Sequence, residues 1–561
     1  MLFESDAARF REIVAGYYSA WFRYHPEAAV DAGVEGYDHL LTPYGEEPMG
    51  ALVCLNDELR TSLEEIDYNK LDEDGALDYQ LLYGAAMLEN QRLLDVEPRR
   101  PDPGRLLPVN AIYQLTVRPV ADFSAALLAR LRAIPDHLDG ARSFLHDRAA
   151  NIPLPWLQAA VTSARQGQVF LGGLPAHPKV KEAGATGPEF AQALQQAGEA
   201  LAAYGEFLER ELGAGAGGDI ACGRSYFDHL LRYRHFLDID SDELHHMGAA
   251  LVEQCRAELK TACRALTGNE DIAGALRQIR AHQPPTRDLL ALYRRQMQAA
   301  REFLAAHRLV NLPAPADLEV VETPGFLRHR IPFAAYHEPA PRDPDQRGYY
   351  FVTPPQTDEE WAEHLVDGIA HTCVHEAWPG HHLQFVTANL APAARSLPRL
   401  LNASSTLYEG WALYCEQLMH EQGFLHGPEH VFLLSRDRLW RALRIVIDVE
   451  LHTRGLTLEA GAQRLVAELG FAQNQARGEL LWYSQSPAVP MGYATGWALI
   501  NALREGEQTR EAQSFDLKTF HDRLLSAGSI ALPLVIERCF GKQVWEQTSN
   551  HVFNEVRHAT P

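Results

Sequence analysis

Apolar residues recur along most of the chain with the period of an amphipathic helix. The first instance is the clearest, because positions i, i+3, i+4, i+7, i+8 and i+11 are all apolar or aromatic, at Phe10, Ile13, Val14, Tyr17, Tyr18 and Trp21. Pro26 follows the expected end of this helix. Side chains in such a pattern usually pack into a core. The pattern therefore predicts a mainly α protein.

Further helices are expected in both halves of the chain, separated by proline and glycine. In the first half they are expected over 48–66, 75–94, 121–133, 136–149, 153–168, 189–211, 224–235, 241–265 and 270–281. In the second half they are expected over 357–376, 403–421, 428–452, 457–469, 472–484, 494–509, 516–526 and 531–540. Thr357 and Glu360 have the spacing of a capping box at the start of the helix that leads to His375.

The stretch 312–356 differs from the rest, because its nine prolines nearly exclude a helix. Short strands fit this composition, above all Gly348–Thr353, where three aromatic residues and a valine follow a glycine. Two interpretations stay open. The stretch could supply an edge strand that pairs with an extended peptide, or it could be a proline-rich loop that covers the core.

The chain, at 561 residues, is long for a single hydrophobic core, which favours two or more lobes. A boundary between about 268 and 290 would give an N-terminal helical lobe, 1–280, and a C-terminal lobe, 281–561. One continuous domain is the alternative. Gly213–Gly218 is dense in glycine and is expected to be a turn or a flexible joint.

The charge balance narrows the choice of partners. The 51 basic and 74 acidic residues give a net charge of −23, which argues against binding to nucleic acid or to an anionic membrane surface. Seven scattered cysteines, with no Cys-x-x-Cys pair, indicate unpaired thiols in a reducing compartment. We find no signal peptide and no long uncharged apolar run, so we expect a cytoplasmic protein.

Residues 371–382 concentrate the chemistry of the chain, with four histidines and a glutamate in twelve positions. His375-Glu376 begins like the His-Glu-x-x-His helix of zinc peptidases, but the residue at i+4 is Pro379. On an unbroken helix, His381 at i+6 would point about 120° away from His375, and His382 at i+7 would lie about 10.5 Å along the axis. Neither could share a metal ion with His375 unless the helix deforms.

Pro379-Gly380 supplies a reason for deformation. Proline removes a backbone donor and clashes with the preceding turn, and glycine can adopt a positive φ. We expect the helix to break or bulge here, so that His381 swings back beside His375. Two alternatives stay open: His371 and His375, at i and i+4, could bind the metal without distortion and leave His381 and His382 for other contacts, or all these histidines could be structural.

A third ligand is expected from the helix over 403–421. Glu409 and Glu416 are seven residues apart and share a face of this helix. Glu409 is the preferred ligand, because the small residues Gly410 and Ala412 beside it allow close packing against the metal helix. Glu416 is expected to lie on a solvated helix face. Three nitrogen and oxygen ligands with one open position are the parts of a catalytic zinc site.

These residues resemble the bacterial family known as domain of unknown function 885, which is similar to zinc peptidases of the gluzincin type. The likeness rests on His375–Gln384, which contains the pattern His-Glu-x-x-Pro-Gly-His, and on Glu409–Tyr414 followed by Glu416. Weaker matches extend along nearly the whole chain. The sequence departs from the family pattern at Ala488 and Val489 and around Asp448–His452.

The resemblance implies a predominantly helical, zincin-like fold with a deep cleft and a small β element near the metal. It also implies that His375, His381 and Glu409 bind the metal and that Glu376 is the catalytic base. Tyr493, at the start of a predicted helix after an irregular loop, is a candidate donor to the oxyanion, with a packed loop aromatic as the alternative.

The function expected from these residues is zinc-dependent hydrolysis of short peptides by water, with one Zn²⁺ per chain. Mn²⁺ or Co²⁺ could occupy the same ligands. Arg441 and Arg444 could hold a peptide C-terminal carboxylate, although a surface position is the alternative expected for each. Two other functions stay open: hydrolysis of a non-peptide amide or ester, and binding of metal or peptide without catalysis.

Overall fold

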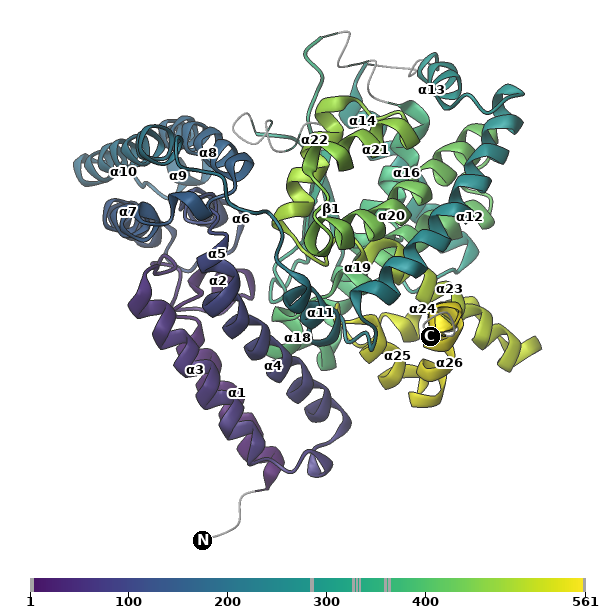
Figure 1. Cartoon of the computed structure of the whole chain (residues 1–561), viewed down its shortest axis with the longest axis horizontal. Helices are drawn as coiled ribbons and strands as arrows, with labels where there is room; N and C mark the ends of the chain where they lie inside the picture. Colours follow the sequence, from purple (N-terminus) through teal and green to yellow (C-terminus); the bar gives the residue numbers. More distant parts are fainter. Residues whose placement is uncertain are drawn as a thin grey trace. The chain divides into compact units, whose positions relative to one another are not determined.

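The computed structural model describes residues 5–282, 287–324, 328, 331, 334–357, 361 and 365–557. As the sequence predicts, the protein is mainly helical with a small sheet (Figure 1). It forms two compact units. The N-terminal unit comprises the described residues up to Cys222 together with Ala340–Asp343. The C-terminal unit comprises Gly223–Pro339 and the described residues from Pro344 onward.

The N-terminal unit consists of helices packed in two groups. In the first, α1 packs on α3 and α3 on α4; in the second, α10 packs on both α7 and α8 (Figure 1). The helices of this unit are α1 (Asp6–Trp21), α2 (Pro26–Asp31), α3 (Glu46–Glu64), α4 (Glu73–Gln91), α5 (Glu97–Arg99), α6 (Val109–Val117), α7 (Phe123–His146), α8 (Leu154–Gly173), α9 (Pro178–Glu182) and α10 (Pro188–Phe207).

Helix α7 corrects one prediction, because a single helix replaces the two expected over 121–133 and 136–149. Pro135 lies inside it. A proline in a helix interior costs about 3 kcal/mol. The helix continues because Leu131, Ile134 and Leu138, on both sides of the proline, are buried in the same core.

The C-terminal unit holds the other helices and the only sheet among the described residues. Its helices are α11 (Arg224–Tyr233), α12 (Ser241–Thr267), α13 (Ile272–Arg280), α14 (Leu289–His307), α16 (Val366–Glu376), α17 (His381–Leu390), α18 (Leu397–Leu401), α19 (Ser405–Glu421), α20 (Pro428–Thr453), α21 (Leu458–Leu469), α22 (Gln473–Gln485), α23 (Gly492–Glu511), α24 (Leu517–Leu524), α25 (Leu532–Phe540) and α26 (Lys542–Arg557).

The division between the units falls after Cys222, whereas the sequence placed it near 280. The difference arises because α12 packs along α20, nearly two hundred residues later in the chain (Figure 1). The contact is close: a Cβ added to Gly248 of α12 would lie 2.6 Å from Cγ2 of Ile445 in α20. This packing joins α12 to the C-terminal core. The glycine-rich stretch Gly213–Gly218 lies just before the observed division.

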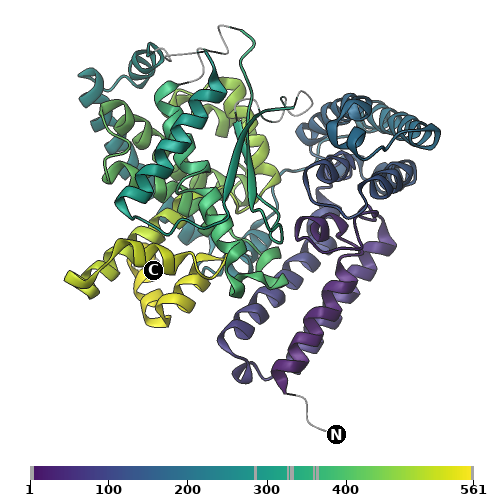
Figure 2. The same cartoon turned by 180° about the vertical axis from the view of Figure 1, so that it is seen from behind.

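The sheet comes from the proline-rich stretch, and it has the order β1-β3-β2 (Figure 2). β1 (Asp317–Glu322) runs parallel to β3 (Arg347–Val352), and β2 (Ala334–His337) pairs antiparallel with it. The strand predicted over Gly348–Thr353 is β3, which lies at the centre, so the edges belong to β1 and β2. The predicted capping box includes Glu360, which lies outside the described residues; α16 begins at Val366.

Helices α6, α14 and α26 are not among the predicted ones, although the buried Leu292, Met297 and Leu304 of α14 have helical spacing. All seven cysteines are free, as predicted, whereas the reducing compartment stays a prediction. Within the described residues, no helix combines the length and the apolar character needed to cross a bilayer.

Candidate metal centre

The helix that carries His375 breaks as the Pro-Gly pair predicts. α16 ends at Glu376 and α17 begins at His381. The break folds tightly onto the end of α16: the backbone N–H of Trp378 donates to Cys373 O at 3.2 Å, and that of Gly380 donates to Val374 O at 3.0 Å. His381 therefore starts a new helix instead of continuing the old one.

Gly380 is required at the break for a reason that the sequence did not give. The prediction invoked a positive φ, but Gly380 has a φ of −67°. The constraint is space, because an added Cβ would lie 1.7 Å from the carbonyl oxygen of His375. A side chain of any size would push the two helix ends apart.

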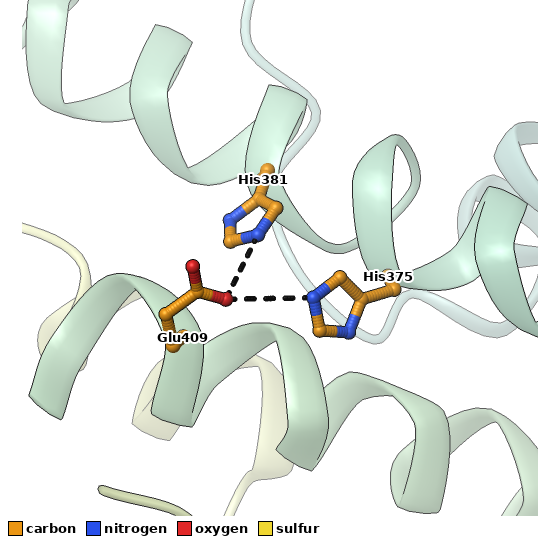
Figure 3. A group of neighbouring side chains, drawn as sticks. All are labelled: His375, His381 and Glu409. Carbon is orange, nitrogen blue, oxygen red and sulfur yellow. Dashed lines mark ion pairs between the residues drawn. The ribbon is translucent and has the colours of Figure 1, made fainter. Parts of the chain in front are cut away.

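Three side chains meet across this break (Figure 3). Nε2 of His375 lies 3.5 Å from Oε2 of Glu409, and Nε2 of His381 lies 3.2 Å from the same oxygen. The two imidazole rings are 4.9 Å apart between centroids and nearly perpendicular, at 87°. One atom from each of the three residues lies within 4.8 Å of the others. The structure thus brings together the three residues predicted as metal ligands.

The donor set fits a divalent cation. Oε2 of Glu409 is buried and accepts no hydrogen bond from the described residues, although two imidazole nitrogens face it. Burial lowers the pKa of His375, but the nearby carboxylates of Glu409 and Glu416 outweigh this and raise it to about 10. Burial raises the pKa of Glu409, and the two histidines more than reverse this. These carboxylates therefore favour positive charge between the rings, which a metal ion supplies.

Glu416 corrects a prediction, since its side chain is not solvated. It is 2% exposed, and Nδ1 of His375 lies 2.7 Å from its Oε1. A hydrogen bond donated by Nδ1 leaves the Nε2 lone pair free for a metal and fixes the plane of the ring. The signal was present in the sequence, because Glu416 shares a helix face with Glu409.

The other two histidines of the motif have different partners. Nε2 of His371 lies 3.0 Å from Nδ1 of His430, and burial lowers the pKa of His371 to about 4. Nδ1 of His382 lies 3.0 Å from the Tyr336 hydroxyl of β2, and burial lowers its pKa to about 3. Neither belongs to the group that could hold the ion. The undistorted pair of His371 and His375 is therefore not the pair that converges.

Glu409 reaches the site and α19 packs on the metal helix α16, but Gly410 does not make the expected contact. Gly410 contacts α23 instead of the metal helix: an added Cβ would lie 2.6 Å from Cα of Gly496. The face of α19 toward the break is formed by Trp411, whose Nε1 donates to Pro379 O at 2.8 Å. Gly410 thus joins α19 to α23, and Trp411 joins α19 to the break.

The close approach of α23 brings Tyr493 to the site. Its ring stacks on that of His375, at 6.4 Å between centroids and 15° between planes. Burial raises the pKa of its hydroxyl, and the Glu409 carboxylate raises it further. The preceding loop is fixed by the buried Asp448, which accepts hydrogen bonds from the backbone N–H groups of Ala488 at 3.3 Å and Met491 at 3.2 Å.

A cavity of about 470 Å³ opens beside His375, and its walls include Glu376 and Tyr493. Ala334 of the edge strand β2 also lines it, so the small β element lies near the site as expected. Arg441 and Arg444 also line this cavity. Both are buried, which contradicts the surface position expected as the alternative.

The fold has close relatives among solved structures. A lipoprotein candidate of unknown function from Shewanella oneidensis has a TM-score of 0.76 at 20% identity, over 94% of this chain and 98% of that chain. A lipoprotein candidate from Colwellia psychrerythraea has a TM-score of 0.77 at 18% identity, over 98% and 100%. At these levels of identity, the two similarities show a shared fold and nothing about activity.

Three further comparisons concern a more distant structure, curated sequences and a family model. Trypanosoma cruzi metallocarboxypeptidase 1 aligns with a TM-score of 0.41 at 10% identity, over 98% of this chain and 100% of that chain. That score is too low to support an inference about fold or activity. A comparison with curated protein sequences finds no significant match. The model of the family described as bacterial protein of unknown function, DUF885, matches residues 26–538, so the chain belongs to this family.

Proposed function

We propose that this protein is a metal-dependent peptidase that hydrolyses short peptides, with one Zn²⁺ held by His375, His381 and Glu409. The observation that carries the proposal is the convergence of these three side chains, one of which, His375, lines a cavity together with Glu376 and Tyr493. Two imidazoles and one carboxylate are a ligand set of catalytic zinc sites. Mn²⁺ and Co²⁺ accept the same donors. When bound, such an ion acidifies water and polarises a carbonyl group.

Glu376 is the proposed general base. It is the last residue of α16, directly after His375, and its side chain lines the same cavity. Its carboxylate takes a proton from the attacking water while the water oxygen bonds to the carbonyl carbon. The same proton then passes to the leaving nitrogen as the C–N bond breaks, which gives an amine and a carboxylic acid, and the acid then loses its own proton to solvent.

Tyr493 is the proposed donor to the oxygen that gains negative charge. Its ring lies against His375, and the raised pKa of the hydroxyl keeps it protonated and able to donate. Asp448 acts at a distance, because it holds the loop that ends at the first turn of α23. We assign Asp448 a positioning role.

A peptide substrate fits the surroundings of the site. The cavity volume of about 470 Å³ lies in the range of small-ligand sites, which is enough for a short peptide segment. Among the described residues β2 is the last strand on its side of the sheet, and Ala334 at its start lines the cavity. An edge strand in this position suits an extended peptide backbone.

The test is to replace Glu376 by Gln, which removes the base and keeps the shape. Turnover of a broad library of short peptides should fall by about 10²- to 10⁴-fold, while metal analysis still finds one ion per chain. Glu302→Gln, at an exposed glutamate of α14, is the matched control and should leave both unchanged.

A His381→Ala variant completes the test, because it should lose both the metal and the activity. Retained turnover in Glu376→Gln would remove the base assignment. If the wild-type protein binds metal but cleaves no peptide in the library, the substrate is a different amide or ester, or the protein only binds.

A further inference from the structure

One wall of the cavity is built by arginines of a single helix. Arg436, Arg441 and Arg444 of α20 all line it, together with the indole of Trp440. Arg441 is 9% exposed and Arg444 is 4% exposed. Three guanidinium groups at this depth are unusual, because a buried cation is stable only where its charge and its N–H groups find partners.

The partners of these arginines leave donors unused. Nε and Nη1 of Arg441 and Nη1 of Arg444 are buried and donate to no acceptor among the described residues. Asp437 lies 3.6 Å from Nη1 of Arg441, which is an ion pair but is too long for a hydrogen bond. The other nitrogens of Arg444 donate hydrogen bonds: Nε to the Tyr483 hydroxyl at 2.9 Å and Nη2 to Glu479 at 3.0 Å. Two neighbouring arginines of the cavity wall therefore carry buried donors without an acceptor in the described part of the chain.

The two guanidinium groups are held in place by aromatic rings. Trp440 lies beneath both, with its ring centroid 3.9 Å from Cζ of Arg441 and 4.4 Å from Cζ of Arg444. This fixes the planes of the groups before a ligand arrives, which lowers the entropy cost of binding. A planar anion with two oxygens is the ligand that such donors match.

The charge of this wall points to a monoanion. Asp437 and Glu479 also line the cavity and offset two of the three arginine charges. About one positive charge is left on this wall, which matches a single carboxylate better than a phosphate dianion. The other carboxylates of the lining, Glu376 and Glu416, lie beside His375.

The distance between the candidate metal ligands and the arginines indicates which carboxylate of a peptide could bind here. The Tyr493 ring lies near both sites, 6.4 Å from the His375 ring and 4.3 Å from Cζ of Arg444. The His375 ring and the Arg444 guanidinium are therefore at most about 11 Å apart. An extended chain advances about 3.5 Å per residue. A carboxylate one or two residues beyond the scissile bond spans this interval.

We propose that Arg441 and Arg444, together called the arginine pocket, bind the C-terminal carboxylate of a peptide, so that the enzyme removes one or two residues from the carboxyl end. This inference rests on the proposed peptidase function and adds to it the direction of attack and the substrate class. A long chain that continues past the pocket would leave the buried donors unsatisfied and should be a poor substrate.

The experiment compares two matched libraries of N-acetylated tripeptides, one with free carboxyl ends and one with C-terminal amides. The metal-loaded wild-type protein should cleave the free acids at least about 30-fold faster, as expected for a buried charge pair. Mass spectrometry should identify released single residues or dipeptides from the carboxyl end. Amidated peptides that end in glutamate distinguish a side-chain carboxylate from the terminal one, and they should stay poor substrates.

Arg441→Gln is the preferred variant, because Arg441 has fewer partners than Arg444 and its loss disturbs the core least. It should lower kcat/KM for the free acids by at least about 30-fold, mainly through KM, and lower the slow cleavage of the amides much less, so that the preference for acids is lost. Arg441→Lys keeps the charge without the planar fork and should restore part of the loss. Arg438→Gln, on the same helix but outside the cavity wall, is the control and should behave as the wild type.

A binding measurement separates this inference from the proposed function. Calorimetry with Glu376→Gln should find that N-acetylated dipeptide acids bind at least about 30-fold more tightly than their amides. Equal binding or equal cleavage of acids and amides would overturn the arginine pocket even in an active peptidase. Selective binding of acids without turnover by the wild type would support the pocket and count against the peptidase.

Discussion

At the scale of single residues, the site depends on the hydrogen-bond partners that each side chain has or lacks. His375 is useful as a ligand because Glu416 occupies its other nitrogen, at 2.7 Å. Glu409 presents a buried oxygen that no hydrogen bond satisfies among the described residues. A buried polar atom without a hydrogen-bond partner distinguishes a metal site from histidines whose hydrogen bonds are all made within a core.

Replacement of Glu416 by Gln tests the support of His375. We expect metal affinity to fall by about 10- to 100-fold, because the amide orients the ring without the negative charge that strengthens the ligand. Competition with a chelating dye measures the change. Glu421→Gln, on the same helix α19 but paired with Arg504, is the control. Unchanged affinity in Glu416→Gln would show that this carboxylate is structural.

Replacement of Gly380 by Ala tests the break. Because the new Cβ would meet the His375 carbonyl at 1.7 Å, the backbone must shift and separate the two histidines. We expect a loss of bound metal and of activity, measured by metal analysis and peptide turnover. Gly478→Ala in α22, where an added Cβ meets nothing within 4 Å, should retain both. A Gly380→Ala protein with full metal content would mean that the break is not under this constraint.

At the scale of elements, close helix packing places the third ligand and the tyrosine. α19 and α23 approach through glycines, since a Cβ on Gly496 would lie 2.0 Å from Thr406 O. Glu409 lies next to Gly410 in this contact, and Tyr493 lies one turn before Gly496. The two side chains converge because the backbones can touch.

Gly496→Ala therefore should disturb both stability and catalysis. We expect the free energy of unfolding to fall by about 1–3 kcal/mol, as for other overpacked cores, and turnover to fall because Tyr493 moves away from His375. Denaturant unfolding and peptide assays measure these effects. Gly506→Ala, on the same helix in open space, should be neutral or slightly stabilising. Equal effects from both substitutions would contradict the packing explanation.

At the scale of the whole molecule, all residues of the candidate site belong to the C-terminal unit. The ligands come from α16, α17 and α19, and the cavity adds residues of α14, α20, α22 and α23. An ion held here stabilises the state in which these elements are assembled. The N-terminal unit supplies none of the described ligands.

Metal removal should therefore act on one unit. Hydrogen exchange measured with and without EDTA should find faster exchange in α16, α17 and α19 after the metal is removed, with α1, α3 and α4 unchanged. EDTA added with excess Zn²⁺ is the control and should restore protection. A uniform change in both units would mean that the ion stabilises the chain as a whole.

Most of the site and much of the fold could be predicted from the sequence. Periodicity located most helices, and the Pro379-Gly380 pair predicted the break between α16 and α17. The shared helix face of Glu409 and Glu416 was visible in the sequence, but the burial of Glu416, Arg441 and Arg444 was not, because a charged residue on a helix has the same pattern whether its partner is water or a distant helix. The division after Cys222 was missed because it depends on α12 packing against α20.

By itself, the sequence determined the mainly helical character, the interruption before His381 and the donor atoms available for a metal, because helix period, proline geometry and ligand chemistry are local properties. Tertiary structure decided which histidines converge, which carboxylate supports them and which arginines lose contact with water. Those outcomes depend on contacts between helices far apart in the chain, such as Gly410 with Gly496 and Trp411 with Pro379. No local pattern records such contacts.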